Sequence, residues 1–200
     1  MFVVMKSTVR TYRMTARARA VEETRAAVLD AVIALHTERL SSDISLADVA
    51  ERAGVSVQTV LRHFGSREGL VDAALERGGA DVEDERRVPP GDVAAGVRAV
   101  VKHYELRGDG VLLLLAQEGS EPFAARVTRH GRALHRRWVT DTFGPLLPPG
   151  PEGEEVVDLL VVATDVYTWK LLRRDRGLSV ARTRARMERL VRAVLAVPPG

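Results

Sequence analysis

Apolar residues recur at helical spacing along almost the whole chain, whereas the alternating pattern of a half-buried strand is scarce. Between residues 20 and 40, one face of the predicted helix carries Val28, Leu29, Val32, Ile33 and His36. Between residues 179 and 197, the apolar positions are Met187, Leu190, Val191, Val194 and Leu195. The pattern predicts an all-α protein of about nine helices.

Three short helices are predicted between residues 46 and 77, because a capping residue precedes each of them. These residues are Ser45, Ser56 and Ser66. Ser45 also has Asp48 three residues later, which is the spacing of a capping box. We expect the third short helix to end at Gly78-Gly79, since glycine is common just after the last residue of a helix.

The first two short helices have the pattern of a helix-turn-helix between Leu46 and Phe64. Ala50 is small enough for two helices that cross steeply, and Gly54 tolerates the positive φ that the turn requires. Side chains expected in the core are Val49, Ala53, Val55, Val60 and Phe64. Side chains expected to face outward from the second helix are Val57, Gln58, Thr59, Arg62 and His63. An ordinary helical hairpin is the alternative, but the small, turn and capping residues at these offsets favour the DNA-binding motif.

This segment resembles the DNA-binding domain of the tetracycline-repressor (TetR) family. The resemblance rests on the run Ser45-Leu46-Ala47-Asp48-Val49-Ala50-Glu51-Arg52-Ala53-Gly54-Val55-Ser56, then Arg62-His63-Phe64, then Ser66-Arg67-Glu68-Gly69-Leu70. It implies a three-helix helix-turn-helix head, followed by a helical body for ligand binding and dimerisation. Leu61 departs from the pattern, because many members carry a phosphate-binding tyrosine there, and Arg67 replaces the commoner lysine.

The resemblance also implies roles for the outward-facing residues of the head. Ser45 and Ser56 would direct helix N-termini and hydroxyls at phosphates. Gln58 and Thr59 would face base edges, and Val57 would contact a thymine methyl group. The residues implied to hold the DNA backbone are His63 and Arg67, and Arg62 completes the expected interface. Gln58 is the leading candidate for base recognition, because glutamine can pair with adenine through two hydrogen bonds.

The first 20 residues are basic, although the chain carries 30 basic and 27 acidic residues and a net charge of only +3. Their basic residues are Lys6, Arg10, Arg13, Arg17 and Arg19. Such an arm can bind phosphates or enter a groove, which adds Arg19 to the expected DNA contacts, and a solvated flexible tail is the alternative. The expected organisation is a flexible arm at 1–19, a head at 20–79, a linker at 80–91 and a body at 92–200.

The body is predicted to be helical throughout. One helix is expected to stop near Gly108-Asp109-Gly110, and the apolar run 111–117 favours a further buried helix over a strand. Pro122 suits the first turn of the next helix. The segment 144–153 is rich in proline and glycine and is expected to be a loop.

Two helices, at about 154–175 and 179–197, are the expected dimer interface. The first is apolar around its whole circumference at Val156, Val157, Leu159, Leu160, Val161, Val162 and Ala163. One of its faces therefore needs a cover beyond the helix's own domain. The resemblance implies that these helices form a four-helix bundle with their copies, and a fully buried helix in a monomer is the alternative.

The resemblance further implies that the body encloses a pocket for a small-molecule effector. The residues expected there are Tyr104, His130, Leu134, Trp138, Asp165 and Trp169. An ionisable group such as Asp165 on an apolar helix is either satisfied internally or lines a cavity. The apolar lining suggests a hydrophobic compound, and Asp165 would favour a cation. Ordinary core packing is the alternative for His130 and both tryptophans.

Other functional classes find little support in the sequence. The chain has no cysteine and no apolar run long enough to span a bilayer, so we expect a cytoplasmic protein without disulfides, metal or cofactor. No nucleophile elbow, P-loop, Rossmann glycine pattern or HExxH motif occurs. We expect a repressor that binds a near-palindromic double-stranded DNA operator as a homodimer and leaves it when an effector binds. A regulator without an effector and a helical enzyme are the alternatives.

Overall fold

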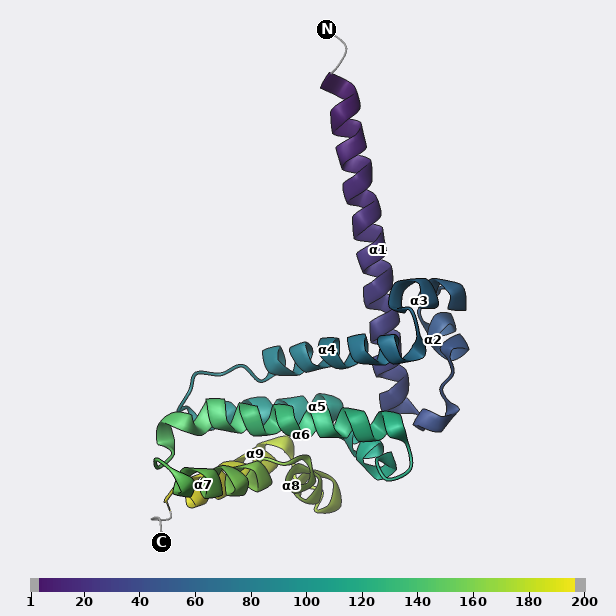
Figure 1. The fold of residues 1–200 in the computed structure, drawn as a ribbon. Coiled ribbons are helices and arrows are strands. Elements are labelled where there is room, and N and C mark those ends of the chain that lie inside the picture. The colour runs from purple at the N-terminus through teal and green to yellow at the C-terminus, as the bar shows by residue number, and fades with distance from the viewer. Residues whose placement is uncertain (1–3, 197–200) are drawn as a thin grey trace. The chain divides into compact units, whose positions relative to one another are not determined.

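The computed structural model describes residues 4–196, with side chains from residue 17 onward, and it divides into two units. We call Met1–Arg77 the head and Gly78–Gly200 the body. Every regular element in the described part of the chain is a helix, which confirms the all-α prediction (Figure 1). No described helix is both long enough and apolar enough to cross a membrane.

The head is built around the contact between its longest helix and the helix-turn-helix. Its elements are α1 (Val4–Glu38), η1 (Ser41–Asp43), α2 (Leu46–Arg52), α3 (Val57–Phe64) and the first part of α4 (Arg67–Glu85). Its buried core includes Val28, Leu29, Val32, Leu35, Ile44, Val49, Ala50, Val60 and Leu70. Ala53, Val55 and Phe64 pack against this core as predicted, which fixes the faces that α2 and α3 turn inward.

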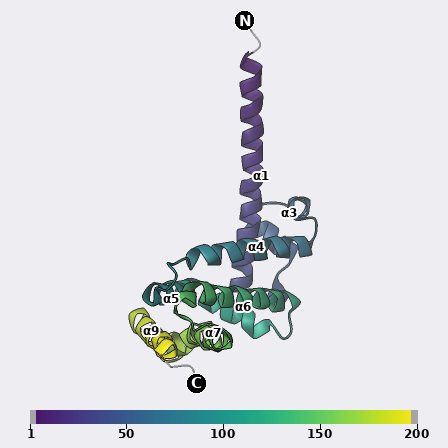
Figure 2. The ribbon, with the colours of Figure 1, turned by 60° about the vertical axis from the view of Figure 1, so that its left-hand side comes forward.

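Helix α1 begins earlier than the sequence pattern indicated. It runs without interruption from Val4, whereas we expected a helix from about residue 20 (Figure 2). The segment 4–19 contains neither proline nor glycine, so no residue in it breaks the helix. Residues 1–3 of the expected arm lie outside the described residues, and the flexibility of the arm stays a prediction.

Helix α4 does not end at Gly78-Gly79, as the sequence had suggested, but continues to Glu85. A Cβ atom on Gly79 would lie only 2.9 Å from Nε2 of His130 and 3.5 Å from Cδ1 of Leu134. The glycine therefore permits close packing of two helices and does not stop one of them. As a result, the connection that we expected from residue 80 starts only after Glu85.

The body is a set of helices packed around α5. Its elements are α5 (Val93–Gln117), α6 (Pro122–Phe143), η2 (Gly144–Leu146), α7 (Pro151–Ala163), α8 (Val166–Lys170), the π-helical turn η3 (Leu171–Asp175) and α9 (Val180–Ala196). Helix α5 contacts α6, α8 and α9, and α7 contacts α6 and α9. The core between them includes Val97, Val100, Val101, Val139, Phe143, Leu160, Trp169, Met187 and Val191.

The predicted stop at Gly108-Asp109-Gly110 is also wrong, because α5 passes through these residues. A Cβ atom on Gly108 would lie 2.6 Å from Cζ3 of Trp169, whose side chain is completely buried. Here too a glycine inside a helix allows a large side chain to approach the backbone. The apolar run 111–117 is correctly predicted as helix, but it is the last part of α5.

The helix predicted over 154–175 is interrupted at Thr164 and Asp165. Helix α7 starts at Pro151 and ends at Ala163, and a new helix, α8, starts at Val166. The Asp165 carboxylate accepts a hydrogen bond of 2.8 Å from the backbone N–H of Tyr167. Asp165 is therefore the N-cap of α8 and does not lie within an apolar helix.

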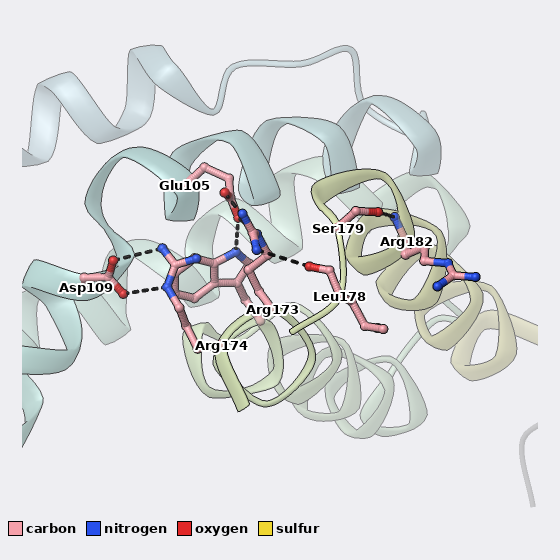
Figure 3. Close-up of polar contacts among 8 residues, drawn as sticks. Glu105, Asp109, Arg173, Arg174, Leu178, Ser179 and Arg182 are labelled. Carbon is pink, nitrogen blue, oxygen red and sulfur yellow. Dashed lines mark hydrogen bonds and ion pairs between the residues drawn. The ribbon is translucent and has the colours of Figure 1, made fainter. Parts of the chain in front are cut away.

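Two arginines attach the π-helical turn η3 to α5 (Figure 3). Arg173 pairs with Glu105 at 3.0 Å, and Arg174 pairs with Asp109 at 2.8 Å. The indole N–H of Trp169 also donates to Glu105, at 2.8 Å. These contacts hold Trp169 against α5, where Gly108 leaves room for it.

Candidate DNA-binding face and the polar interior of the body

The turn between α2 and α3 has the geometry of a helix-turn-helix. Gly54 has a φ of 67°, which glycine adopts without steric cost. The hydroxyl of Ser56 accepts a hydrogen bond of 3.1 Å from the backbone N–H of Thr59 and so caps α3. Ala50, at the contact between the two helices, is buried. The small residue, the turn and the cap therefore all occupy the places that the sequence predicted.

Helix α3 turns one face into the head and leaves the other in solvent. Val60 is 1% exposed and lies in the core of the head. The exposed residues of this segment are Ser56, Val57, Gln58, Leu61 and Arg62, and Thr59 and His63 are half-buried. Neutral donors, acceptors and a cation therefore share one surface, as contact with bases and phosphates requires.

Ser45 forms the capping box that its spacing predicted. Asp48 donates its backbone N–H to the Ser45 hydroxyl at 3.2 Å, and the Ser45 backbone N–H donates to the Asp48 carboxylate at 2.8 Å. The Ser45 hydroxyl also donates to that carboxylate. The hydroxyl and then the backbone N–H of Ser45 lower the pKa of Asp48 to about 2. In this conformation the hydroxyl proton of Ser45 is directed at Asp48.

The two outlying arginines of the predicted interface each have a partner in the protein. Arg67 donates from Nη2 to the backbone carbonyl of Ile44 at 3.1 Å, and Arg19 pairs with Glu23 at 3.0 Å. A guanidinium has five N–H donors, so these contacts orient the arginines and leave donors for phosphate. Nothing in the sequence indicated a contact between Arg25 and Phe64. The Cζ atom of Arg25 lies 4.7 Å from the centre of the Phe64 ring.

Comparison with known families decides the identity of the head. Residues 28–74, which span the helix-turn-helix, match the family model described as bacterial regulatory proteins, tetR family. The head is therefore a TetR-family DNA-binding domain, and the protein that carries it is a DNA-binding transcriptional regulator.

Solved structures extend the likeness from the head to the fold of most of the chain. A tetR-family transcriptional regulator from Streptomyces coelicolor is similar with a TM-score of 0.64, at 20% identity over 88% of this chain and 89% of that one. A transcriptional regulator from Rhodococcus sp. Rha1 gives a TM-score of 0.61, at 20% identity over 89% of this chain and 99% of that one. A search of curated proteins finds no match.

Two of the six pocket residues expected in the body border one cavity. A cavity of about 300 Å³ is bordered by Leu134 and Trp138, together with residues of α4 and of the connection after it. Tyr104 and Trp169 are buried beside each other, with ring centres 5.8 Å apart, and Tyr104 donates to the Thr164 carbonyl at 3.1 Å.

His130 and Asp165 of that set are not among the residues that border this cavity. His130 is half-buried, and its Nε2 atom has no hydrogen-bond partner among the described residues. Asp165 caps α8, and its partial burial raises the pKa of its carboxyl. The expectation of a cation-binding site at Asp165 therefore loses its structural argument, which was an acid within an apolar helix.

The buried charge of the body is Arg86, which the sequence placed in a linker. Its side chain is 6% exposed, and its Cζ atom lies 5.2 Å from the centre of the Tyr104 ring and 5.7 Å from that of Trp138. Nη1 donates to Nδ1 of His135 at 3.1 Å. The carbonyl of Arg86 accepts the indole N–H of Trp138 at 3.0 Å. The flanking prolines made this segment look like a surface loop, so no sequence signal indicated a buried arginine.

Two buried histidines lie beside Arg86, and both are neutral at pH 7. Burial and then the charge of Arg86 lower the pKa of His135 to about 3 and that of His103 to about 4. Because arginine can only donate, Nδ1 of His135 accepts and Nε2 carries the proton. Nε2 then donates to the Thr164 hydroxyl at 3.2 Å. No cluster with the composition of a metal site occurs in the described part of the chain.

Proposed function

We propose that this TetR-family regulator is a dimeric repressor that binds a near-palindromic operator and is released by a small-molecule effector in its body. The observation that carries the proposal is the exposed polar face of α3, which is held by the buried Val60 and a capped N-terminus. A helix of this kind fits the major groove, where its first residues reach base edges.

The division of labour on α3 follows from the chemistry of its side chains. Gln58 can pair with a base through both ends of its amide, and Val57 offers a methyl surface to thymine. Arg62, His63 and Arg67 are placed after these residues and would bind phosphates. Ser45 and Ser56, the N-caps of α2 and α3, would bring the N-termini of these helices to phosphates of the DNA backbone.

Dimerisation is supported by apolar side chains that the body leaves in solvent. Leu159 and Val162 of α7 are 54% and 65% exposed, while Val157 and Leu160 of the same helix are buried in the core. Leu190 of α9 is 45% exposed. A second copy of the chain would cover these residues, because exposed apolar groups of this kind mark interaction surfaces. The helices at 151–163 and 180–196 are therefore the proposed interface.

Release by an effector is supported by the polar groups in the interior of the body. A ligand shifts the protein away from DNA only if it binds the two conformations with different affinity. Charged and aromatic groups around a cavity provide the specific contacts that such a difference requires. Occupation of a promoter by the dimer would exclude polymerase, so repression needs no further surface.

Selection from random-sequence DNA with the full chain tests the DNA-binding part of this proposal. We expect enriched sites with two inverted half-sites, separated by about one helical turn of 10 to 10.5 base pairs or a multiple of it. The control is the double variant Gln58→Ala with Arg62→Ala, which keeps the core of the head and should enrich such sites much less strongly. Enrichment of single, non-repeated sites, or equal enrichment by the control, would contradict the proposal.

A further inference from the structure

The guanidinium of Arg86 lies in the interior of the body without a carboxylate partner among the described residues. It is 6% exposed, and its hydrogen bonds go to neutral groups, the ring of His135 and the side chain of Tyr104. Its Nε atom is buried and has no hydrogen-bond partner. An ionised group in such surroundings is costly unless an opposite charge and acceptors are supplied.

The adjacent acid does not supply that charge, because it is engaged elsewhere. Glu85 accepts hydrogen bonds from Arg107 at 3.0 Å and 2.5 Å and lies 2.7 Å from Nδ1 of His103. Burial alone would raise the pKa of Glu85, but these two partners hold it below its usual range. Asp165 acts on Arg86 only through the longer-range field and forms the cap of α8.

The guanidinium is held in a fixed orientation. Tyr104 and Trp138 both lie near it, and Trp138 is stacked on His135 with ring centres 5.6 Å apart. His135 in turn donates to the Thr164 hydroxyl, which donates to the Leu160 carbonyl at 2.7 Å. A guanidinium with fixed donors and free N–H groups is suited to recognise a carboxylate through two parallel hydrogen bonds.

Arg86 also borders the cavity of about 300 Å³, whose volume matches a small organic ligand. Leu134, Trp138 and Val82 give this cavity apolar walls. Two acids, Glu83 and Asp141, also line it, but Glu83 pairs with Arg137 at 3.2 Å and Asp141 is exposed at the surface. The charge on the buried side of the cavity is therefore that of Arg86.

We infer that the cavity beside Arg86 binds a small aromatic or apolar carboxylate, with the carboxylate on the guanidinium and the apolar part against Trp138. The inference rests on the proposed function only in that it makes this compound the effector. Binding would satisfy the orphaned Nε and would compete with His135 for the guanidinium. The hydrogen bonds from His135 lead to Thr164, at the break between α7 and α8. A ligand beside Arg86 would therefore alter the contacts at the end of α7, which is one of the proposed dimer helices.

Calorimetric titration of the full-length protein without DNA tests this site. The probes are benzoate and 1-naphthoate, the corresponding neutral amides, and inorganic phosphate. We expect saturable binding of at least one carboxylate and binding at least about tenfold weaker for its amide, because a hydrogen-bonded charge pair contributes that much. Inorganic phosphate should bind no better than the amides, since it leaves the apolar walls unused. Equal binding of acid and amide, or phosphate binding as tight as that of the carboxylates, would overturn the inference, as would the absence of saturable binding.

Variants assign the effect to Arg86. Arg86→Gln should weaken carboxylate binding at least about tenfold, and Arg86→Lys should weaken it less, because the charge remains without the planar fork. Arg87→Gln is the matched control: it removes an exposed neighbouring charge from the same cavity lining and should leave affinity nearly unchanged. If Arg86→Gln does not fold, the comparison of Arg86→Lys with Arg87→Gln decides the question. Equal losses in Arg86→Lys and Arg87→Gln would refute a specific site.

The effector role has a separate readout. A carboxylate that binds in the titration should also release the selected operator DNA from the wild type, and release from Arg86→Lys should need a higher concentration, in proportion to its weaker binding. Binding without release would reject the effector role and keep the site. Failure to select any operator would count against the proposed function and would leave the titration result standing.

Discussion

Single side chains on α3 divide the proposed recognition of DNA between sequence and charge. Gln58 is exposed and makes no hydrogen bond with the described residues, whereas the hydroxyls of Ser56 and Thr59 are hydrogen-bonded to each other at 3.0 Å. The amide of Gln58 is therefore available for a base edge, while the two hydroxyls help to fix the first turn of α3. Leu61, where a tyrosine is common in the family, is exposed and offers no hydrogen bond.

We predict that Gln58→Ala weakens binding to the selected operator by about 1–3 kcal/mol and relaxes preference at one base-pair position in each half-site. Competition binding with operators that differ at single positions measures both effects. Arg62→Ala is the comparison, because loss of a phosphate contact should weaken binding to all sequences alike and reduce the salt dependence. An unchanged base preference in Gln58→Ala would show that this glutamine does not read a base.

At the residue scale, the sequence identified the face of α3 but missed Arg86. The inward positions of the head follow a helical period, so Val60 and Phe64 could be placed without a structure. Arg86 has no such pattern, because its burial depends on Tyr104 and Trp138, which come from two helices of the body. Burial that arises only from tertiary packing leaves no local signal.

At the scale of helices, glycine explains the boundaries that were predicted incorrectly. Gly79 and Gly108 were interpreted as helix stops, yet both lie inside continuous helices at close contacts with His130 and Trp169. A glycine that ends a helix and one that admits a neighbour look the same in sequence, because both lack a Cβ atom. Only the partner distinguishes them, and the partner is distant in the chain.

We predict that Gly108→Ala lowers the free energy of unfolding by about 1–3 kcal/mol, as overpacking in a core does. The new methyl group would lie 2.6 Å from the indole of Trp169, which is held by Glu105 and cannot easily withdraw. Urea unfolding followed by circular dichroism measures the change.

Gly131→Ala is the matched control in α6, because a Cβ atom there meets nothing within 4 Å. That substitution should stabilise the protein by about 0.5–1 kcal/mol, the usual preference for alanine inside a helix. If both variants moved stability in the same direction, the packing explanation for Gly108 would be wrong.

For the whole molecule, the proposed function requires two copies of the chain. One α3 reads only a few base pairs, so useful affinity comes from two heads tied together. The apolar residues that α7 and α9 expose form the proposed dimer interface. The sequence led us to expect an interface here because residues 156–163 are apolar except for Asp158, although it did not indicate the break after Ala163.

We predict that Val162→Glu shifts the protein from dimer to monomer at micromolar concentration, because a carboxylate would be buried in an apolar interface. Sedimentation velocity measures the change, and operator affinity should fall with it. Leu106→Glu is the matched control: Leu106 is 71% exposed on α5, outside the proposed interface, and its replacement should leave the mass unchanged. A wild-type protein that sediments as a monomer would refute the interface.

The placement of the two tryptophans gives the protein an optical reporter of its own. Trp138 and Trp169 are the only indoles in the sequence. Trp138 borders the cavity next to Arg86, whereas Trp169 is sealed in the core against α5. A ligand entering the cavity would change the emission of one fluorophore and leave the other as an internal reference. Ligand binding in this cavity can therefore be followed by intrinsic tryptophan fluorescence, without a label and without DNA.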